Sequence, residues 1–135
     1  MKKHLLSLFF IAFFSVSLSQ NWTWMRGDNF NGATPGTYGT MGVPATTNTP
    51  GHRHGSATWV DASGNFWLFG GEGHSSVSTL SWLNDLWRYN PTTNEWTWIR
   101  GSNGMNATGS YGTQTIPSSS NDPGARESSV SWVDN

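Results

Sequence analysis

Two short segments of the chain hold side chains that could bind a metal ion. His52 and His54 alternate along the sequence, so in an extended chain both imidazoles point to the same side. Glu72 and His74 repeat that spacing. Imidazole and carboxylate groups are common ligands of Zn²⁺ and related ions, so these four residues are weak candidates for a metal site. The other interpretation is that they are polar residues at strand entries, and we expect neither a bound metal nor a cofactor.

Tryptophan is abundant, with nine among 135 residues. An indole ring can stack on a sugar, so the composition invites a carbohydrate-binding interpretation. Trp82 is the best candidate for such a contact, because it lies among Ser, Thr and Gly in a predicted loop over residues 72–83. The other eight lie in segments of strand character, where packing is the expected role. They are Trp22, Trp24, Trp59, Trp67, Trp87, Trp96, Trp98 and Trp132.

Arg53 and Tyr38 recur as Arg126 and Tyr111 in a second block of similar sequence. Residues that recur in this way belong to a repeated unit. We expect the arginine to hold loop carbonyls and the tyrosine to pack against a neighbour. They could also converge with the other candidates on one binding surface. The predicted ligand-contact residues are therefore Trp82, His74, Arg53, Tyr38, Tyr111 and Arg126.

The sequence contains no recognisable catalytic motif. It has no cysteine, no Gly-x-Ser-x-Gly elbow, no His-Glu-x-x-His and no phosphate-binding loop. These absences favour a role other than catalysis.

The N-terminal residues are typical of a secretion signal. Two lysines precede an almost wholly apolar run over residues 5–16, and two small serines suit cleavage before Gln20. The run is too short to span a bilayer comfortably. We therefore expect residues 1–19 to be removed and the mature chain, without a membrane span, to be secreted or held at a cell surface. The style of the signal favours a bacterial origin.

The mature chain is mildly acidic. It holds five arginines against eight acidic residues, a nominal net charge of −3, so no nucleic-acid partner is expected. Because it has no cysteine, its stability must come from burial and backbone pairing.

The sequence contains a tandem repeat of about 73 residues. Residues 21–34 match residues 95–108 at eight of fourteen positions, with an offset of 74. Residues 37–61 match residues 110–134 at twelve of 25 positions, with an offset of 73. The shared Trp-Thr-Trp and Trp-Val-Asp runs are more specific than chance matches between polar loops. A period of this size indicates a solenoid or a propeller.

Within one period, four short runs have the composition of strands, and no segment has a helical pattern. The turn signals at 61–64 and 90–94 should join the first two and the last two runs as hairpins. The sequence therefore predicts an all-β fold. The four runs are residues 54–60, 65–70, 84–90 and 95–100.

Together these features resemble a kelch repeat. Pro50-Gly51-x-Arg53 leads into the first run, Gly70-Gly71 closes the second, Tyr89 lies in the third, and Trp96 follows six residues after Asn90. The resemblance covers Pro50 to Gly101 and implies a kelch-type β-propeller, as in the central domain of galactose oxidase.

The period departs from the kelch pattern in its length. Kelch repeats are usually about 50 residues long. The excess lies mainly in the connection over residues 101–123, which recurs as residues 27–50.

The repeat predicts a chain of partial blades around one complete blade. A propeller needs about four blades to close, so we expect a fragment that requires further blades of the same protein. The predicted parts are a signal peptide over 1–19, a final strand (21–26) with a long inter-blade loop over 20–49, a complete blade over 50–101, and a second loop with a first strand (127–133) over 102–135.

The resemblance implies a binding surface where the inter-blade connections meet the loop between the second and third strands. We expect an extracellular binding or scaffold module for a protein or glycan. The copper chemistry of galactose oxidase does not transfer, because it needs a tyrosine crosslinked to a cysteine. The alternative is a fragment of a galactose-oxidase-like or glycan-modifying enzyme whose active site lies in other blades.

Overall fold

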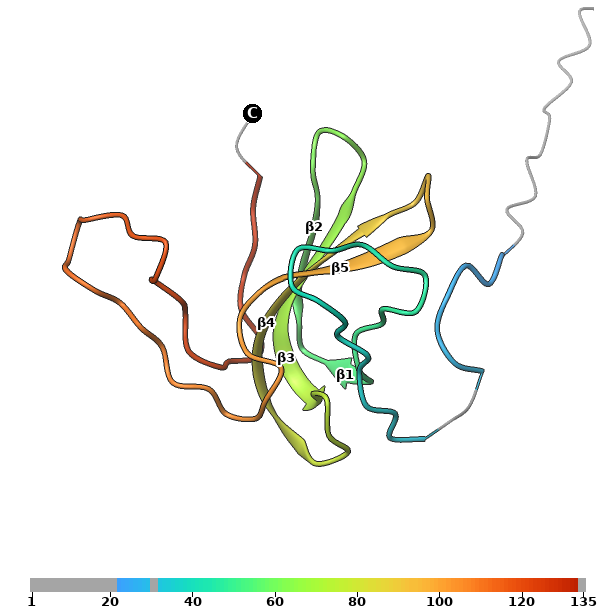
Figure 1. The fold of residues 1–135 in the computed structure, drawn as a ribbon, viewed down its shortest axis with the longest axis horizontal. Helices are drawn as coiled ribbons and strands as arrows, with labels where there is room; N and C mark the ends of the chain where they lie inside the picture. The colour runs from blue at the N-terminus through green and yellow to red at the C-terminus, as the bar shows by residue number, and fades with distance from the viewer. Residues whose placement is uncertain (1–21, 30–31, 134–135) are drawn as a thin grey trace, which may run out of the picture.

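A computed structural model describes residues 22–29 and 32–133 (Figure 1). The predicted signal peptide lies outside these ranges. Within them there is no helix, and hence none long and apolar enough to cross a lipid bilayer. The fold is all-β, as predicted, and consists of one antiparallel sheet.

The sheet has five strands in the spatial order β1–β3–β4–β5, and β2 also pairs with β3. β1 and β2 therefore lie one after the other along the same edge of β3. The interruption between them contains Gly55, whose φ of 64° is left-handed and favours glycine. The strands are β1 Arg53–His54, β2 Ala57–Val60, β3 Phe66–His74, β4 Leu80–Asn90 and β5 Glu95–Arg100.

Both predicted hairpins are confirmed. In the β2–β3 turn, Asp61 Oδ1 accepts hydrogen bonds of 2.9 Å from the backbone N–H groups of Ser63 and Asn65. Hydrogen bonds from the Asn65 side chain and from the Trp67 indole lower the pKa of Asp61 to about 2. In the β4–β5 turn, Asn90 Oδ1 accepts a hydrogen bond of 2.9 Å from Thr92 N.

β3 and β4 are longer than the sequence predicted. The predicted loop over 72–83 is mostly paired strand, with Glu72 opposite Trp82 and His74 opposite Leu80. Only residues 75–79 connect the two strands. The one glycine of this segment, Gly73, is required by close packing, because a Cβ there would lie 2.4 Å from Arg53 Cβ.

The two predicted flanking strands are not formed in the described structure, because residues 22–26 and 127–133 carry no strand. A strand needs a neighbour that accepts its backbone hydrogen bonds. Three of the predicted packing tryptophans lie in these segments and are exposed, whereas their counterparts one period away are half-buried in the sheet. The exposed residues are Trp22, Trp24 and Trp132, and the counterparts are Trp96, Trp98 and Trp59.

The long connections fold in the same way in both copies of the repeat. We call residues 37–49 the first repeat loop and residues 110–122 the second repeat loop. Each is closed by one antiparallel bridge between its ends. In each, an asparagine side chain crosses the loop: Asn48 Nδ2 donates to Val43 O at 3.0 Å, and Asn121 Nδ2 donates to Ile116 O at 3.3 Å. The repeat is therefore present in the structure as well as in the sequence.

The two repeat loops differ in what lies behind them. The first packs on the β4–β5 part of the sheet, where Gly42 N donates to Trp98 O at 2.7 Å and Ala45 N to Trp96 O at 3.3 Å. The second extends away from the sheet, drawn in orange and red in Figure 1. Its residues 111–120 are all exposed.

Candidate functional site

A buried charged cluster joins the first repeat loop to the sheet. Arg53 Nη1 and Nη2 donate to the two carboxylate oxygens of Asp85 at 2.6 and 2.8 Å. Tyr38 OH and Trp87 Nε1 donate to Asp85 Oδ2 at 2.6 and 2.7 Å. The side chains of Arg53 and Asp85 are 4% and 0% exposed. Four hydrogen bonds thus satisfy a carboxylate that would be very costly to bury alone.

Burial and the charge of Asp85 change the pKa values of the tyrosine and the arginine in this cluster. Burial, and then the charge of Asp85, raise the pKa of the Tyr38 phenol above its ordinary value. Burial lowers the pKa of Arg53, but the hydrogen bonds and charge of Asp85 outweigh it and raise that pKa overall. Both donors therefore keep their protons at any physiological pH. The cluster is suited to fastening the loop to the sheet and not to proton transfer.

Three of the predicted ligand-contact residues lie inside the fold. Tyr38 is 5% exposed and His74 is 8% exposed. Arg53 has the predicted role of holding loop carbonyls, because it donates to Gly51 O at 3.0 Å and to Gly70 O at 3.2 Å. These three side chains are therefore largely buried, although Arg53 and His74 line the edge of a hollow.

Sequence reasoning missed Asp85, the partner of Arg53. A signal was present: the residue is a carboxylate in a predicted strand, directly before Leu86 and Trp87. A buried carboxylate requires a cation or several donors, and Arg53 was the cation that recurs in the repeat.

The corresponding candidates of the second copy are exposed. Tyr111 is 64% exposed. Its hydroxyl accepts hydrogen bonds from Arg126 Nη2 at 3.1 Å and from Gly124 N at 3.3 Å. Arg126 Nε also donates to Gly124 O at 3.0 Å, as Arg53 does to Gly51 O. The arginine keeps its local contacts in both copies.

Trp82 lies on β4 and not in a loop, and it is 52% exposed. Its partner across the ladder is Glu72 of β3, whose partner in turn is His54 of β1. Residues directly opposite each other on antiparallel strands present their side chains on the same face. An imidazole, a carboxylate and an indole therefore form a line across three strands. We call His54, Glu72 and Trp82 the aromatic–acid row.

Two hollows meet at the aromatic–acid row. One, of about 480 Å³, is lined by Trp82, Leu80, Glu72 and Asn106 among others. The other, of about 490 Å³, is lined by His54, His74 and again Glu72 and Leu80. Asn106 is fixed in place because its backbone N donates to Trp82 O and its Oδ1 accepts from Trp82 N, both at 3.0 Å. Glu72 thus lines both hollows.

The four predicted metal candidates, His52, His54, Glu72 and His74, all line the second hollow, but not all of their ligand atoms are close together. His54 and Glu72 are close, with 3.4 Å between His54 Nε2 and Glu72 Oε2. The third potential ligand beside them is Glu127, which sequence reasoning did not select, and not His52 or His74. Glu127 stands one period after His54, so the repeat alignment contained this signal.

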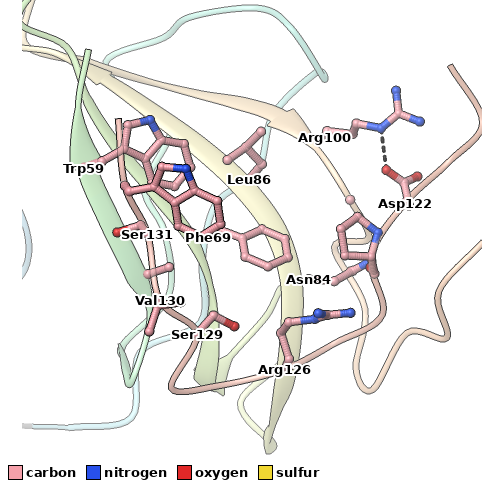
Figure 2. A pocket seen from close by; sticks show the side chains of 14 residues that line it. Trp59, Phe69, Asn84, Leu86, Arg100, Asp122, Arg126, Ser129, Val130 and Ser131 are labelled. Atoms are coloured by element: carbon pink, nitrogen blue, oxygen red, sulfur yellow. Dashed lines mark hydrogen bonds and ion pairs between the residues drawn. The ribbon is translucent and has the colours of Figure 1, made fainter. Parts of the chain in front are cut away.

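A separate pocket of about 430 Å³ lies between the sheet and residues 122–132 of the second copy (Figure 2). Its lining includes Trp59, Phe69 and Leu86 of the sheet, and Val130 and Trp132 of the segment that lies beside β2. The Arg100–Asp122 ion pair lies at its edge (Figure 2). The apolar lining suits packing between two copies of the repeat better than recognition of a polar ligand.

Comparisons of the chain with protein-family models, curated proteins and solved structures found no match. The function must therefore be inferred from the residues of this chain and their geometry.

Proposed function

We propose that the protein is an exported kelch-type propeller module that binds an extracellular glycan through the aromatic–acid row. The observation that carries the binding role is the in-register placement of His54, Glu72 and Trp82 across β1, β3 and β4. It puts an exposed indole beside a carboxylate, with a hollow on each side.

The chemistry of the row matches that of a sugar. A sugar ring has apolar C–H faces and a rim of hydroxyl groups. The Trp82 indole offers a flat apolar surface, and an aromatic ring loses little conformational entropy on binding. The Glu72 carboxylate and the Asn106 side chain supply polar atoms beside it. A few polar groups in a concave, partly apolar site are the usual basis of orientation and specificity.

The propeller part of the proposal is supported by how the second copy meets the first. Ser131 Oγ donates to Thr58 O at 2.8 Å, and these residues are 73 positions apart, one period of the repeat. Ser128 N donates to Gly55 O at 2.7 Å close by. Equivalent segments of successive repeats thus run side by side, which is the arrangement that radial repetition of blades requires.

The double glycine of the predicted kelch pattern supports the same arrangement. The ladder between β3 and β4 shifts between Phe69 and Gly71, and Arg126 fills the gap. Gly71 N donates to Arg126 O, and Arg126 N donates to Leu83 O, both at 2.9 Å. A Cβ on Gly70 would lie 2.7 Å from Arg126 O, so the first glycine is needed for the approach of the next repeat.

The proposal of export rests on the sequence. Residues 1–19 have the basic start, apolar run and small residues of a secretion signal. The mature chain has no cysteine, so an oxidising extracellular environment would not form disulfides in it. The ligand is accordingly proposed to be extracellular.

Glycan binding can be tested with the purified exported protein on a panel of immobilised oligosaccharides, followed by calorimetric titration of the best binder. We expect Trp82→Ala to weaken binding by about tenfold or more, as for the removal of an aromatic anchor, and Trp82→Phe to retain part of it. Phe66→Ala is the matched control, because Phe66 is 48% exposed at the opposite end of β3.

Two outcomes would contradict the proposal. One is glycan binding that is equal in Trp82→Ala and the unaltered protein. The other is a panel without any binder when a protein ligand is captured through the same row.

A further inference from the structure

We propose that His54, Glu72 and Glu127 form a binding site for a divalent transition ion such as Zn²⁺ where the second copy of the repeat meets the first. The potential ligand atoms of the three side chains all lie within 4.8 Å of one another. One imidazole and two carboxylates make a ligand set that Zn²⁺ accepts. We call these residues the junction site. This proposal does not depend on glycan binding.

The distances fit a four-coordinate ion. Zinc is bound by imidazole nitrogen and carboxylate oxygen at about 2.0–2.2 Å, so two ligand atoms of a tetrahedral site stand about 3.3–3.6 Å apart. The 3.4 Å between His54 Nε2 and Glu72 Oε2 equals one edge of such a tetrahedron. Glu127 is exposed and its ligand atom lies within 4.8 Å of those of His54 and Glu72, so a small movement of its side chain is needed to complete the site. The fourth position is left to water or to a ligand.

The first two side chains are held by strand pairing. His54 of β1 and Glu72 of β3 are direct partners in the antiparallel ladder, so their Cβ atoms stand about 4.5–5.5 Å apart on one face. Their backbones need no rearrangement to bind an ion.

The third side chain is held by the inter-repeat hydrogen bonds on either side of it. Arg126, just before Glu127, exchanges backbone hydrogen bonds with Gly71 and Leu83, and Ser128, just after it, donates to Gly55 O. Gly55 also leaves the space that Glu127 occupies, because a Cβ there would lie 3.3 Å from Glu127 Oε2. All three ligands therefore stand on backbone that the fold fixes.

The local charge favours a cation at this place. Among the described residues, the arginine ion pairs go to Asp85 and Asp122, while Glu72 pairs only with His54 and Glu127 has no ion pair. Two carboxylates beside one imidazole repel each other unless a positive charge lies between them.

A buried histidine next to the site gives independent support. His74 is 8% exposed, it lines the same hollow as His54 and Glu72, and its Nδ1 has no hydrogen-bond partner in the described structure. A buried polar atom without a partner is uncommon and calls for an explanation such as an ion or its bound water. A water in the open coordination position could supply that partner.

The repeat suggests why the site lies where it does. Glu127 is the counterpart of His54 one period later, so equivalent positions of successive copies provide two of the three ligands. An ion at this place would link the start of one copy to the sheet of the preceding one. Because Glu72 also belongs to the aromatic–acid row, the ion would lie beside the proposed glycan surface.

The test is calorimetric titration of Zn²⁺ into the whole exported protein after removal of metals by a chelator. Co²⁺ serves as a second probe, because its visible absorption reports coordination number. We expect saturable Zn²⁺ binding, a Co²⁺ spectrum of low coordination number, and the loss of one equivalent in His54→Ala. Glu127→Gln should weaken that equivalent by about tenfold or more.

Glu95→Gln is the matched control for Glu127→Gln, since Glu95 begins β5 and is not part of the junction site. Circular dichroism of each variant checks that the sheet remains folded. The proposal is overturned if the unaltered protein shows no saturable binding, or if both junction variants bind Zn²⁺ as the control does. Neither result would bear on Trp82 and glycan binding.

Discussion

Tyr38 and Tyr111 are the same position of the repeat, one period apart, but their surroundings differ. Each lies in a repeat loop closed by the same bridge and crossed by the same asparagine hydrogen bond. Tyr38 is 5% exposed and packs against Trp87 and Trp98, with ring centroids 4.8 and 5.2 Å away. Tyr111 is 64% exposed. The loop conformation is therefore local, whereas burial of the tyrosine depends on a sheet behind it.

The hydrogen bonds of the two tyrosines show what that sheet contributes. Tyr38 OH donates to Asp85 of β4, and Arg53 binds the same carboxylate. Tyr111 OH instead accepts a hydrogen bond from Arg126. A tyrosine and an arginine are thus present in both copies. In the first copy both side chains donate to the buried carboxylate of Asp85, and these hydrogen bonds hold the loop against the sheet. Substitutions made in one copy at a time test this difference.

The largest effect is expected from Asp85→Ala. It leaves the Arg53 guanidinium buried without a counter-charge, and the removal of one partner of a buried pair costs about 3–5 kcal/mol in the free energy of unfolding. The measurement is chemical denaturation of the exported protein. Asp122→Ala is the matched control, because its ion pair with Arg100 is partly exposed and should contribute about 1 kcal/mol or less. Similar losses from both substitutions would contradict the role given to Asp85.

A smaller difference is expected between Tyr38→Phe and Tyr111→Phe. The first removes a buried hydrogen bond to a charged acceptor, which contributes about 1.5–3 kcal/mol. The second removes an exposed hydroxyl and should change stability by about 0.5 kcal/mol or less. The same denaturation measurement compares them. Equal effects would contradict the conclusion that only the first repeat loop is fastened to the sheet by its tyrosine.

The smallest expected effect is a decrease of the free energy of unfolding as the pH rises above about 10. The pKa of Tyr38 is raised in the folded protein, so above about pH 10 the unfolded chain loses the phenolic proton first. The folded state then binds more protons than the unfolded state, and stability falls as the pH rises. Denaturation between pH 8 and pH 11 should show a slope that Tyr38→Phe reduces. A slope indifferent to Tyr38→Phe would refute the assignment.

The strand and turn predictions succeeded where the signal was local. Asp61 and Asn90 at the turns, and the aromatic runs that follow each, are recognisable without knowledge of any distant residue. The prediction of a loop over 72–83 was wrong for the opposite reason. Its Ser, Thr and Gly residues are typical of a loop, but Gly73 is required within a strand by close packing against Arg53.

The candidate site was predicted only in part. Trp82 was selected, but as a loop residue, so its alignment with Glu72 and His54 was not foreseen. Asp85 was missed, because its burial depends on Arg53, 32 positions earlier in the chain. Glu127 was missed as a neighbour of His54, because that contact depends on how one copy packs against the other.

The sequence by itself determined the repeat, the all-β character and the local turn and loop conformations, because these depend on residue types a few positions apart. Only the tertiary structure decided which copy of the tyrosine is buried, which acid receives the arginine, and which side chains share a face. Those outcomes depend on register and on contacts between distant segments. Tyr38 and Tyr111 illustrate this difference. Both begin the same local sequence, Tyr-Gly-Thr, yet one is buried and the other exposed, and the three residues alone do not indicate which.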